Sequence, residues 1–178
     1  MGSQLRIIAF VTASPLIYLG QIGRISLLRD LFSETITSTT VFAEITKKKD
    51  APELPEIQKA LKDWIKVKKV SNLELLQSLL ATNVIHEGEA TVLALALEGQ
   101  EIEKKVILDD YLARQVAFSL NLKVIGTAGI LLLALKRTLL SKYEFKRDFR
   151  ILCERTSYRI SVELYNEIRN EADNISQS

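Results

Sequence analysis

The sequence predicts an α/β protein built around a parallel β-sheet. Short apolar or β-branched runs alternate along the chain with segments of helical periodicity. A helix separates successive strands, which is what parallel pairing with right-handed crossovers requires. With 178 residues, of which 47% are hydrophobic, the chain is long enough to bury one sizeable core. We therefore expect residues 1–178 to form a single domain.

The chain opens with a predicted strand–helix unit. Residues 5–11 are almost entirely apolar and are expected to form a buried strand. A helix is expected over residues 15–32, starting at Pro15 and loosened near Gly20 and Gly23. Functional residues are commonly found at such a strand–helix junction in an open α/β sheet.

A second unit and a surface excursion follow. TITSTTVFAEI predicts a short strand leading into a helix that carries Glu44, with Ser38 or Thr39 as its N-cap. The polar, proline-containing KKKDAPELP is expected on the surface, before a helix around residues 54–65. These elements extend the same alternating pattern.

The rest of the chain repeats this order. WIKVKKV alternates apolar and basic residues, as a strand at the edge of a sheet does, and NLELLQSLLAT predicts a helix with an Asn cap. HEGEATVLALALEGQ is a strong helix, and KKVILDDYLARQVAFSL and LKVIGTAGILLLALKR are each a strand that runs into a helix. Residues 143–173 are expected to form a C-terminal extension of two helices around TSYRIS.

Composition excludes several classes of protein. The net charge of +2 comes from 24 basic and 22 acidic residues, so no global field favours nucleic acid. The lone Cys153 excludes a disulfide framework within the chain and fits a reducing cytoplasm. No apolar stretch is long enough to span a membrane, because Lys136 and Arg137 interrupt the longest candidate. We expect a soluble, cytoplasmic protein that does not bind membranes.

Polar residues follow the predicted strands, and acidic residues occur in the first turns of helices. In a parallel sheet these positions meet beyond the carboxyl ends of the strands. Several carboxylates in one cleft repel each other unless a cation separates them, and such hard oxygen ligands suit Mg²⁺ or Mn²⁺. The candidates are Thr12, Ser14, Glu44, Glu89, Asp109, Asp110 and Thr127.

Each candidate also has a structural interpretation. Asp109 or Asp110 could simply cap the following helix, and Glu89 could favour the positive end of its helix dipole. Glu44 could be an ordinary solvated residue. His86, the only histidine, is interpreted as a capping or surface residue, because no nucleophile or Cys/His cluster accompanies it.

Other chemistries lack their motifs. GQIGR has neither the preceding strand nor the third glycine of a dinucleotide fingerprint, and the chain contains no phosphate-binding GxxxxGK[ST] loop. One histidine without an elbow-like serine motif gives no catalytic triad, and one cysteine gives no structural zinc site. The acidic cleft is the coherent candidate.

Five segments spread over nearly the whole chain resemble a PIN-domain-like subfamily. They are ASPLIYLGQIGRISLLRDLF, VFAEI, GEATVLALALE, VILDDYLARQVAFSLNLKVIGTAGILLLALKR and ISVELYNEI. The subfamily contains predicted nucleic-acid-binding proteins and is related to the ribonuclease toxins of toxin–antitoxin pairs. The resemblance implies a three-layer α/β/α fold with a central parallel sheet, and Mg²⁺- or Mn²⁺-dependent hydrolysis of single-stranded RNA.

The resemblance also assigns roles to individual positions. It implies that the catalytic, metal-binding acids are Glu44, Glu89 and the pair Asp109 and Asp110. Ser14 and Thr127 would supply supporting hydroxyls. The first acid of the family falls on Thr12, whose neutral hydroxyl is a weaker ligand than a carboxylate, so reduced activity is expected. Candidate RNA contacts are Lys47, Lys48, Lys49 and the segment KRTLLSKYEFKRDFR.

Three functions follow as hypotheses. The first is a PIN-like ribonuclease, the toxin of a toxin–antitoxin pair, which binds a cognate antitoxin protein and forms a homodimer. The second is a catalytically silent PIN-like module that binds RNA or a protein. The third, a small-molecule-binding α/β protein, ranks lower because the sequence reveals no apolar pocket.

Overall fold

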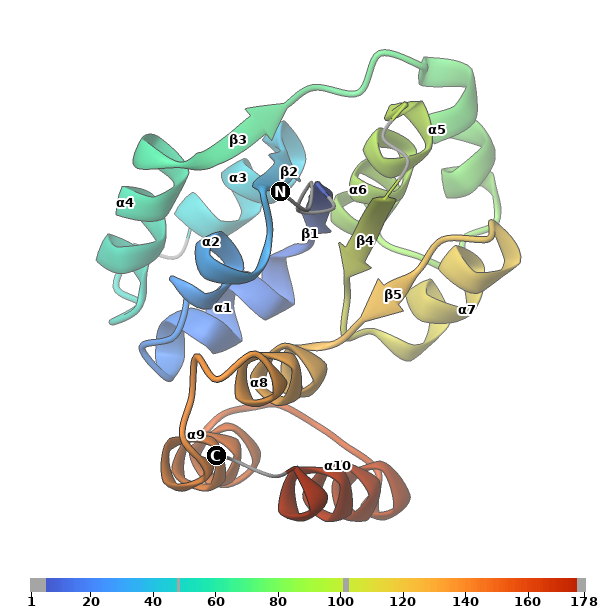
Figure 1. The fold of residues 1–178 in the computed structure, drawn as a ribbon. Coiled ribbons are helices and arrows are strands. Elements are labelled where there is room, and N and C mark those ends of the chain that lie inside the picture. Colours follow the sequence, from blue (N-terminus) through green and yellow to red (C-terminus); the bar gives the residue numbers. More distant parts are fainter. Residues whose placement is uncertain (1–5, 48, 101–102, 176–178) are drawn as a thin grey trace.

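The computed structural model describes residues 6–47, 49–100 and 103–175 (Figure 1). Its sheet has five strands in the order β3-β2-β1-β4-β5, and every neighbouring pair is parallel. The strands are β1 (Ile7–Val11), β2 (Glu34–Ser38), β3 (Ile65–Lys68), β4 (Glu103–Ile107) and β5 (Val124–Ile125). The predicted parallel sheet is confirmed.

Helices connect and cover the strands in this part of the chain. They are α1 (Ala13–Gln21), α2 (Leu27–Leu31), α3 (Thr39–Thr46), α4 (Leu54–Asp63), α5 (Leu73–Ala81), α6 (Glu87–Glu98), α7 (Tyr111–Ser119), α8 (Thr127–Lys136), α9 (Lys142–Arg155) and α10 (Val162–Asn174). Within the described ranges, none of them combines the length and apolar character needed to cross a membrane.

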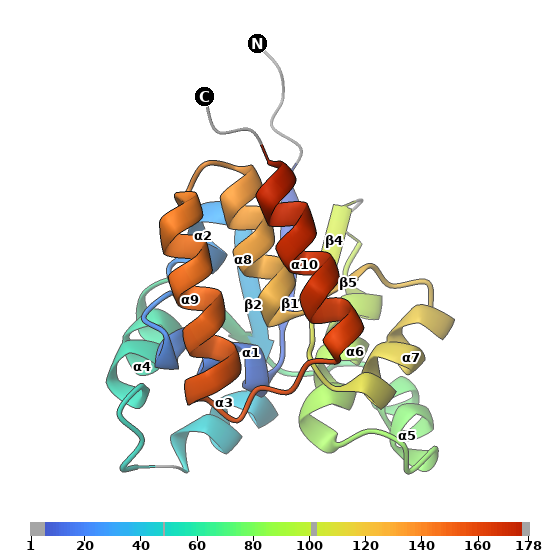
Figure 2. The same ribbon diagram turned by 90° about the horizontal axis from the view of Figure 1, so that it is seen from below.

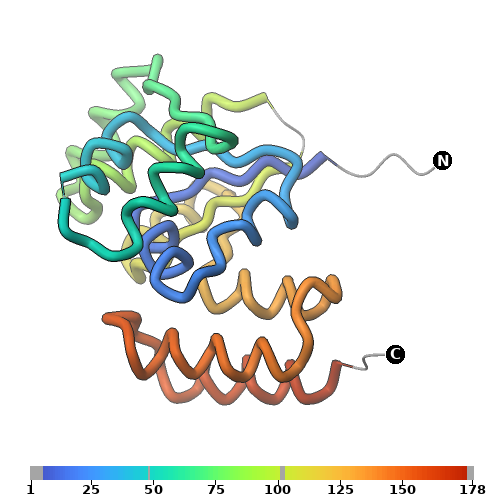
Figure 3. Tube along the Cα trace, turned by 90° about the vertical axis from the view of Figure 1, so that its left-hand side faces the viewer, coloured from blue at the N-terminus to red at the C-terminus, as the bar shows by residue number. Residues whose placement is uncertain are grey.

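The helices form layers on both faces of the sheet. α6 packs against β1, β2 and β4, whereas α2 contacts β2, and α8 contacts α1 and α2 (Figures 1 and 2). α9 and α10 both pack on α8 as an outer pair of helices (Figures 2 and 3). The structure therefore confirms the three-layer α/β/α architecture.

Burial along the strands follows their position in the sheet. In the central strand β1, the side chains from Ile8 to Val11 are at most 2% exposed, because helices cover both faces. The edge strand β3 alternates instead, with Ile65 buried and Lys66 and Lys68 exposed. The half-exposed edge predicted from WIKVKKV is confirmed.

The helix predicted over residues 15–32 is two helices. α1 ends at Gln21, and Gly23 adopts a φ of +68°, a left-handed conformation that glycine accepts without strain. Gly20 is helical, and a Cβ there would lie only 3.0 Å from Ile57 of α4. The glycines therefore have separate roles: one turns the chain between α1 and α2, and the other allows α4 to approach α1.

The C-terminal helices are tied to the turn after α1. Arg24 donates to Asp148 of α9 at 2.6 Å and to Glu144 at 3.1 Å. Asp148 is only 2% exposed and also accepts from Arg147 at 2.8 Å. A buried carboxylate is stable only when it is paired in this way. Arg24 therefore fixes α9 against the turn after α1, while Arg147, which lies on α9 itself, completes the pairing of Asp148.

Candidate functional site

The candidate site lies beyond the carboxyl ends of β1 and β4, as expected for an open parallel sheet. Here the ends of the two strands and the starts of three helices enclose a pocket of about 150 Å³. Its lining residues are Thr12, Ala13, Ser14, Glu44, His86, Gly88, Glu89, Leu108 and Asp110. Three of the four predicted acids thus line one pocket.

Thr12 is the residue at which β1 ends and α1 begins. Its side chain is 3% exposed, and its hydroxyl donates to the carbonyl oxygen of Ile107 at 3.1 Å. Its backbone N–H donates to the same oxygen at 3.2 Å. The hydroxyl proton is therefore used to join β1 to β4, and only the oxygen lone pairs face the pocket.

Ser14 lines the pocket from the first turn of α1 and is exposed. Glu44 comes from α3, which begins at Ser38, the confirmed N-cap that accepts the N–H of Val41. The Glu44 carboxylate lies against Gly88 of α6, where an added Cβ would be 2.9 Å from Oε2. A side chain at position 88 would therefore displace the Glu44 carboxylate from its place beside α6.

Glu89 enters the pocket from the first turn of α6. Its Oε2 accepts the backbone N–H of His86 at 2.9 Å, which caps the helix. Burial raises the pKa of Glu89, and the negative charges of Asp110 and Glu44 raise it further. The three carboxylates are therefore close enough to repel one another electrostatically.

Asp110 is the N-cap of α7. Its Oδ1 accepts the N–H of Ala113 at 2.8 Å, and the residue is exposed at the pocket. The capping interpretation and the pocket position are compatible, because one carboxylate oxygen caps the helix while the other has no hydrogen bond within the described residues. Asp110 thus keeps a donor atom for a ligand.

Asp109 and Thr127 do not line this pocket. Asp109 accepts the N–H of Thr127 at 2.8 Å and its hydroxyl at 2.6 Å, which fastens the end of β4 to the start of α8. Burial raises the pKa of Asp109, and the bonds from Thr127 oppose that rise. The two adjacent aspartates, predicted as one catalytic pair, therefore have different surroundings, and the predicted supporting hydroxyl of Thr127 is bound to Asp109.

His86, which the sequence analysis interpreted as a capping or surface residue, lines the pocket, as does Gly88, which the sequence analysis did not single out. His86 is the N-cap of α6, so the capping interpretation is consistent with its place, but its side chain also faces the cleft. The signal available in the sequence was the cluster HEGE itself, in which a helix start and two acids coincide.

The donor set suits a divalent cation in its chemistry. Glu44, Glu89 and Asp110 offer hard carboxylate oxygens, and a cation would relieve the repulsion that raises the pKa of Glu89. In the ranges that the structure describes, no three His, Cys, Asp or Glu side chains are already grouped closely enough to hold a metal ion. The residues therefore fit by type, and binding would require their side chains to draw together.

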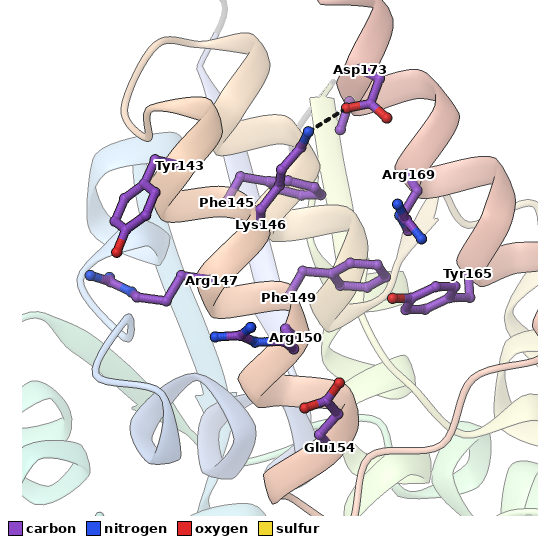
Figure 4. A pocket seen from close by; sticks show the side chains of 11 residues that line it. Tyr143, Phe145, Lys146, Arg147, Phe149, Arg150, Glu154, Tyr165, Arg169 and Asp173 are labelled. Atoms are coloured by element: carbon purple, nitrogen blue, oxygen red, sulfur yellow. Dashed lines mark ion pairs between the residues drawn. The ribbon is translucent and has the colours of Figure 1, made fainter.

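The predicted RNA-contacting cations occupy two separate regions. Lys47 lines a second pocket next to the carboxylates, Lys49 is exposed, and Lys48 lies outside the described residues. Lys146, Arg147 and Arg150, from the segment KRTLLSKYEFKRDFR, line a groove of about 280 Å³ between α9 and α10 (Figure 4).

In the groove between α9 and α10, acidic residues offset much of the basic charge. Lys146 pairs with Asp173 at 2.7 Å (Figure 4), and Arg147 pairs with Asp148 at 2.8 Å. Glu154 also lines the groove, whose aromatic wall is the stacked pair Phe149 and Tyr165. Arg150 and Arg169 also line the groove and form no ion pair within the described residues, so a net positive charge remains there.

Comparison with known protein families finds a match over most of the chain. A family model described as a PIN domain matches residues 8–174. No curated protein matches the sequence. The family match covers every strand of the sheet and all the residues that line the candidate pocket.

Proposed function

Because the chain belongs to the PIN-domain family, whose members generally have metal-dependent nuclease activity, we propose that it is an endoribonuclease that uses Mg²⁺ or Mn²⁺ to hydrolyse single-stranded RNA. The observation that carries the proposal is the convergence of Glu44, Glu89 and Asp110 on one pocket at the carboxyl edge of the sheet. PIN domains are typically dependent on divalent metal ions, and this pocket offers the oxygen ligands that such ions prefer.

In this proposal the three carboxylates hold the cation and Ser14 assists from the start of α1. The chemistry that a bound divalent cation supplies is Lewis-acid stabilisation of the charge that develops on an attacked phosphate. Asp109 is a positioning residue, because its bonds to Thr127 fix the loop in which Asp110 lies. Hydrolysis by this route needs no covalent intermediate with the protein.

Thr12 sets the expected level of activity. A neutral hydroxyl that already donates to Ile107 adds no negative charge to the ligand set, so we expect weak metal binding and slow cleavage. The same observation favours a second candidate function, a catalytically silent PIN-like module that binds RNA or a protein. Metal-dependent cleavage distinguishes the two.

The test is cleavage of a labelled single-stranded RNA with Mg²⁺, with Mn²⁺ and with chelator, by the wild type, Glu89→Gln and Glu56→Gln. Glu56 is an exposed carboxylate on α4 that lines neither pocket, so its variant is the matched control. We expect cleavage that requires metal, that Glu89→Gln removes, and that Glu56→Gln preserves. Cleavage that survives in chelator or in Glu89→Gln would contradict the proposed site.

The biological setting that we propose is a toxin–antitoxin pair in the cytoplasm, with this chain as the toxin and a cognate antitoxin protein as its partner. A small neighbouring gene encoding a DNA-binding protein that copurifies with this chain would support that setting. If expression of the wild type and of Glu89→Gln slows growth equally, toxicity does not come from cleavage and the toxin assignment fails.

We also propose that the chain forms a homodimer. Figures 1 and 2 both show α5 and α7 on the same side of the molecule, and each presents large apolar side chains to solvent. These include Tyr111 (71% exposed), Leu73 (59%) and Leu112 (51%). Large apolar side chains exposed on one side of a molecule are typical of an interface. Light scattering at micromolar concentration should give a dimer, and Leu112→Glu should give a monomer; a monomeric wild type would contradict the proposal.

A further inference from the structure

A second pocket adjoins the one lined by the three carboxylates. It has a volume of about 620 Å³ and shares Glu44, His86 and Gly88 with the first. The residues that it adds are Thr39, Thr40, Ala43, Lys47 and Glu87. Because three residues border both, the two pockets form one continuous cleft, which runs from the ends of β1 and β4 across the start of α6 to α3.

Charge is divided unevenly along this cleft. The end at β1 and β4 holds Glu89 and Asp110, whereas the end at α3 holds one acid, Glu87, together with Lys47, the only cationic side chain among the described residues that line either pocket. Lys47 follows Glu44 by three residues at the end of α3, so both side chains project from the same side of the helix. Glu44 therefore marks the boundary between an acidic end and an end with a lysine.

Lys47 is available to bind a ligand. It is exposed, and within the described residues it forms no ion pair, in contrast to Lys146 and Arg147 in the groove between α9 and α10. Thr39 and Thr40, in the first turn of α3, bring hydroxyl groups to the same pocket, and His86 brings an imidazole. Lys47 offsets the negative charge of Glu87 in this pocket, and with the hydroxyl and imidazole donors it gives the pocket groups that can bind a phosphate.

We propose that the end of the cleft lined by Thr39, Thr40, Lys47 and His86 is a subsite for a phosphate of single-stranded RNA, adjacent to the phosphate that is attacked at the carboxylates. The inference rests on the proposed ribonuclease function and adds the direction in which the substrate lies. RNA enters over α3, Lys47 makes the ionic contact, and the hydroxyls and the imidazole donate hydrogen bonds to phosphate oxygens.

The subsite has a consequence for substrate length. A substrate with only one phosphodiester cannot occupy the carboxylate end and the Lys47 end together, so it loses the ionic contact. Longer RNA molecules gain the ionic contact with Lys47. The chain should therefore prefer internal positions of a strand to a dinucleotide, and this preference should depend on Lys47.

The test measures binding without cleavage. A fluorescently labelled single-stranded RNA of about 10 nucleotides, within the range of known single-strand sites, is titrated with protein in EDTA at several salt concentrations. The proteins are the wild type, Lys47→Ala, Lys47→Arg and Lys123→Ala. Lys123 lies just before β5, at the opposite edge of the sheet, and its variant removes the same charge from a site outside the cleft.

We expect Lys47→Ala to weaken binding about threefold to tenfold at low salt and to reduce the slope of log K against log salt by about 0.7, the value for one phosphate contact with a single strand. Lys47→Arg should restore both quantities, and Lys123→Ala should match the wild type. Equal affinities and slopes for Lys47→Ala and Lys123→Ala, or a wild type that does not bind the RNA, would overturn the subsite.

Cleavage assays separate this inference from the function on which it rests. If the RNA binds with the predicted dependence on Lys47 but is not cut with Mg²⁺ or Mn²⁺, the nuclease proposal fails and the subsite remains. If the RNA is cut and Lys47→Ala changes neither affinity nor slope, the nuclease proposal remains and the subsite fails.

Discussion

Asp109 and Thr127 are joined by two hydrogen bonds that occupy both carboxylate oxygens. The backbone N–H of Thr127 donates to Oδ1 at 2.8 Å, and its hydroxyl donates to Oδ2 at 2.6 Å. The side chain of Thr127 is fully buried, so its hydroxyl has no water to replace this partner. The neighbouring Asp110 is exposed, caps α7 and lines the pocket.

The first prediction follows from this contrast. Asp109→Ala should lower the free energy of unfolding by about 3 kcal/mol, because it leaves buried donors of Thr127 unsatisfied. Asp110→Ala should cost about 1 kcal/mol, the usual effect of losing an N-cap, and should weaken metal binding. Urea denaturation monitored by circular dichroism measures both. Equal losses for the two variants would show that Asp109 is not the structural member of the pair.

The second prediction concerns position 12. Thr12→Asp should increase Mg²⁺- or Mn²⁺-dependent cleavage of single-stranded RNA by at least about tenfold, corresponding to ~1.4 kcal/mol of transition-state stabilisation, because it adds a charged ligand. Without metal the variant should be less stable than the wild type, since it loses the buried bond to Ile107 and adds a fourth acid to the pocket.

Thr12→Asn is the matched control for this substitution, because it has the size of Asp without the charge. Cleavage by Thr12→Asn should stay at the wild-type level, and chelator should abolish the gain in Thr12→Asp. If the Asp and Asn variants cleave equally, or if the wild type already cleaves rapidly, position 12 does not hold the missing ligand.

The third prediction tests the buried ion pair that holds α9. Asp148→Ala removes the buried partner of Arg24 and should lower the free energy of unfolding by about 2 kcal/mol, because a charge-assisted hydrogen bond is lost while Glu144 still pairs with Arg24. Asp30→Ala, which removes an exposed pair with Arg29, should have little effect. Thermal unfolding of both variants provides the comparison; a small loss for Asp148→Ala would mean that α9 is held by apolar contacts alone.

The fourth prediction is a dependence of stability on pH. Three hydrogen-bond donors lower the pKa of Glu144 from 4.5 to about 2. They are the backbone N–H of Ser141, the guanidinium of Arg24 and the hydroxyl of Ser141. A carboxyl group with a lowered pKa in the folded state stabilises the fold above its ordinary pKa and loses that effect as pH falls toward the lowered value. The contribution of Glu144 should therefore be complete above 4.5 and disappear toward about 2.

The measurement is the melting temperature of the wild type and of Glu144→Gln across this range. The wild type should melt higher at neutral pH, and the two curves should converge on acidification. A difference that is independent of pH would show that the ionised form of Glu144 has no special role in the capping interaction.

The alternation of strands and helices made the fold predictable, because each short apolar run was bounded by recognisable helix starts such as Ser38 and Asn72. The break between α1 and α2 was harder to locate. It depends on Gly23 adopting a positive φ, whereas Gly20, three residues earlier, is helical and lies against α4. The local sequence does not reveal which of the two glycines ends the helix, since the contact of Gly20 with α4 comes from tertiary structure.

The sequence predicted the edge of the sheet at which the site lies and the acidic residues that line it. The ends of parallel strands meet by topology, so Thr12, Glu44, Glu89 and one aspartate could be expected together. Which aspartate faces the pocket depends on the bonds to Thr127, which is 18 residues further along the chain. The pocket beside Lys47 adjoins the carboxylates at Glu44, His86 and Gly88, where α3 lies next to the start of α6, and sequence spacing does not reveal this contact.

The ion pair between Arg24 and Asp148 can form only late in protein synthesis. The two residues are 124 positions apart, so at the usual elongation rate of 5–20 residues per second the ribosome needs roughly 6 to 25 s to reach the second after the first. During that interval the turn after α1 lacks the carboxylate that later anchors it, and α8 lacks its cover of α9 and α10. The nascent chain therefore exposes this face to chaperones until nearly all of the described sequence has left the ribosome.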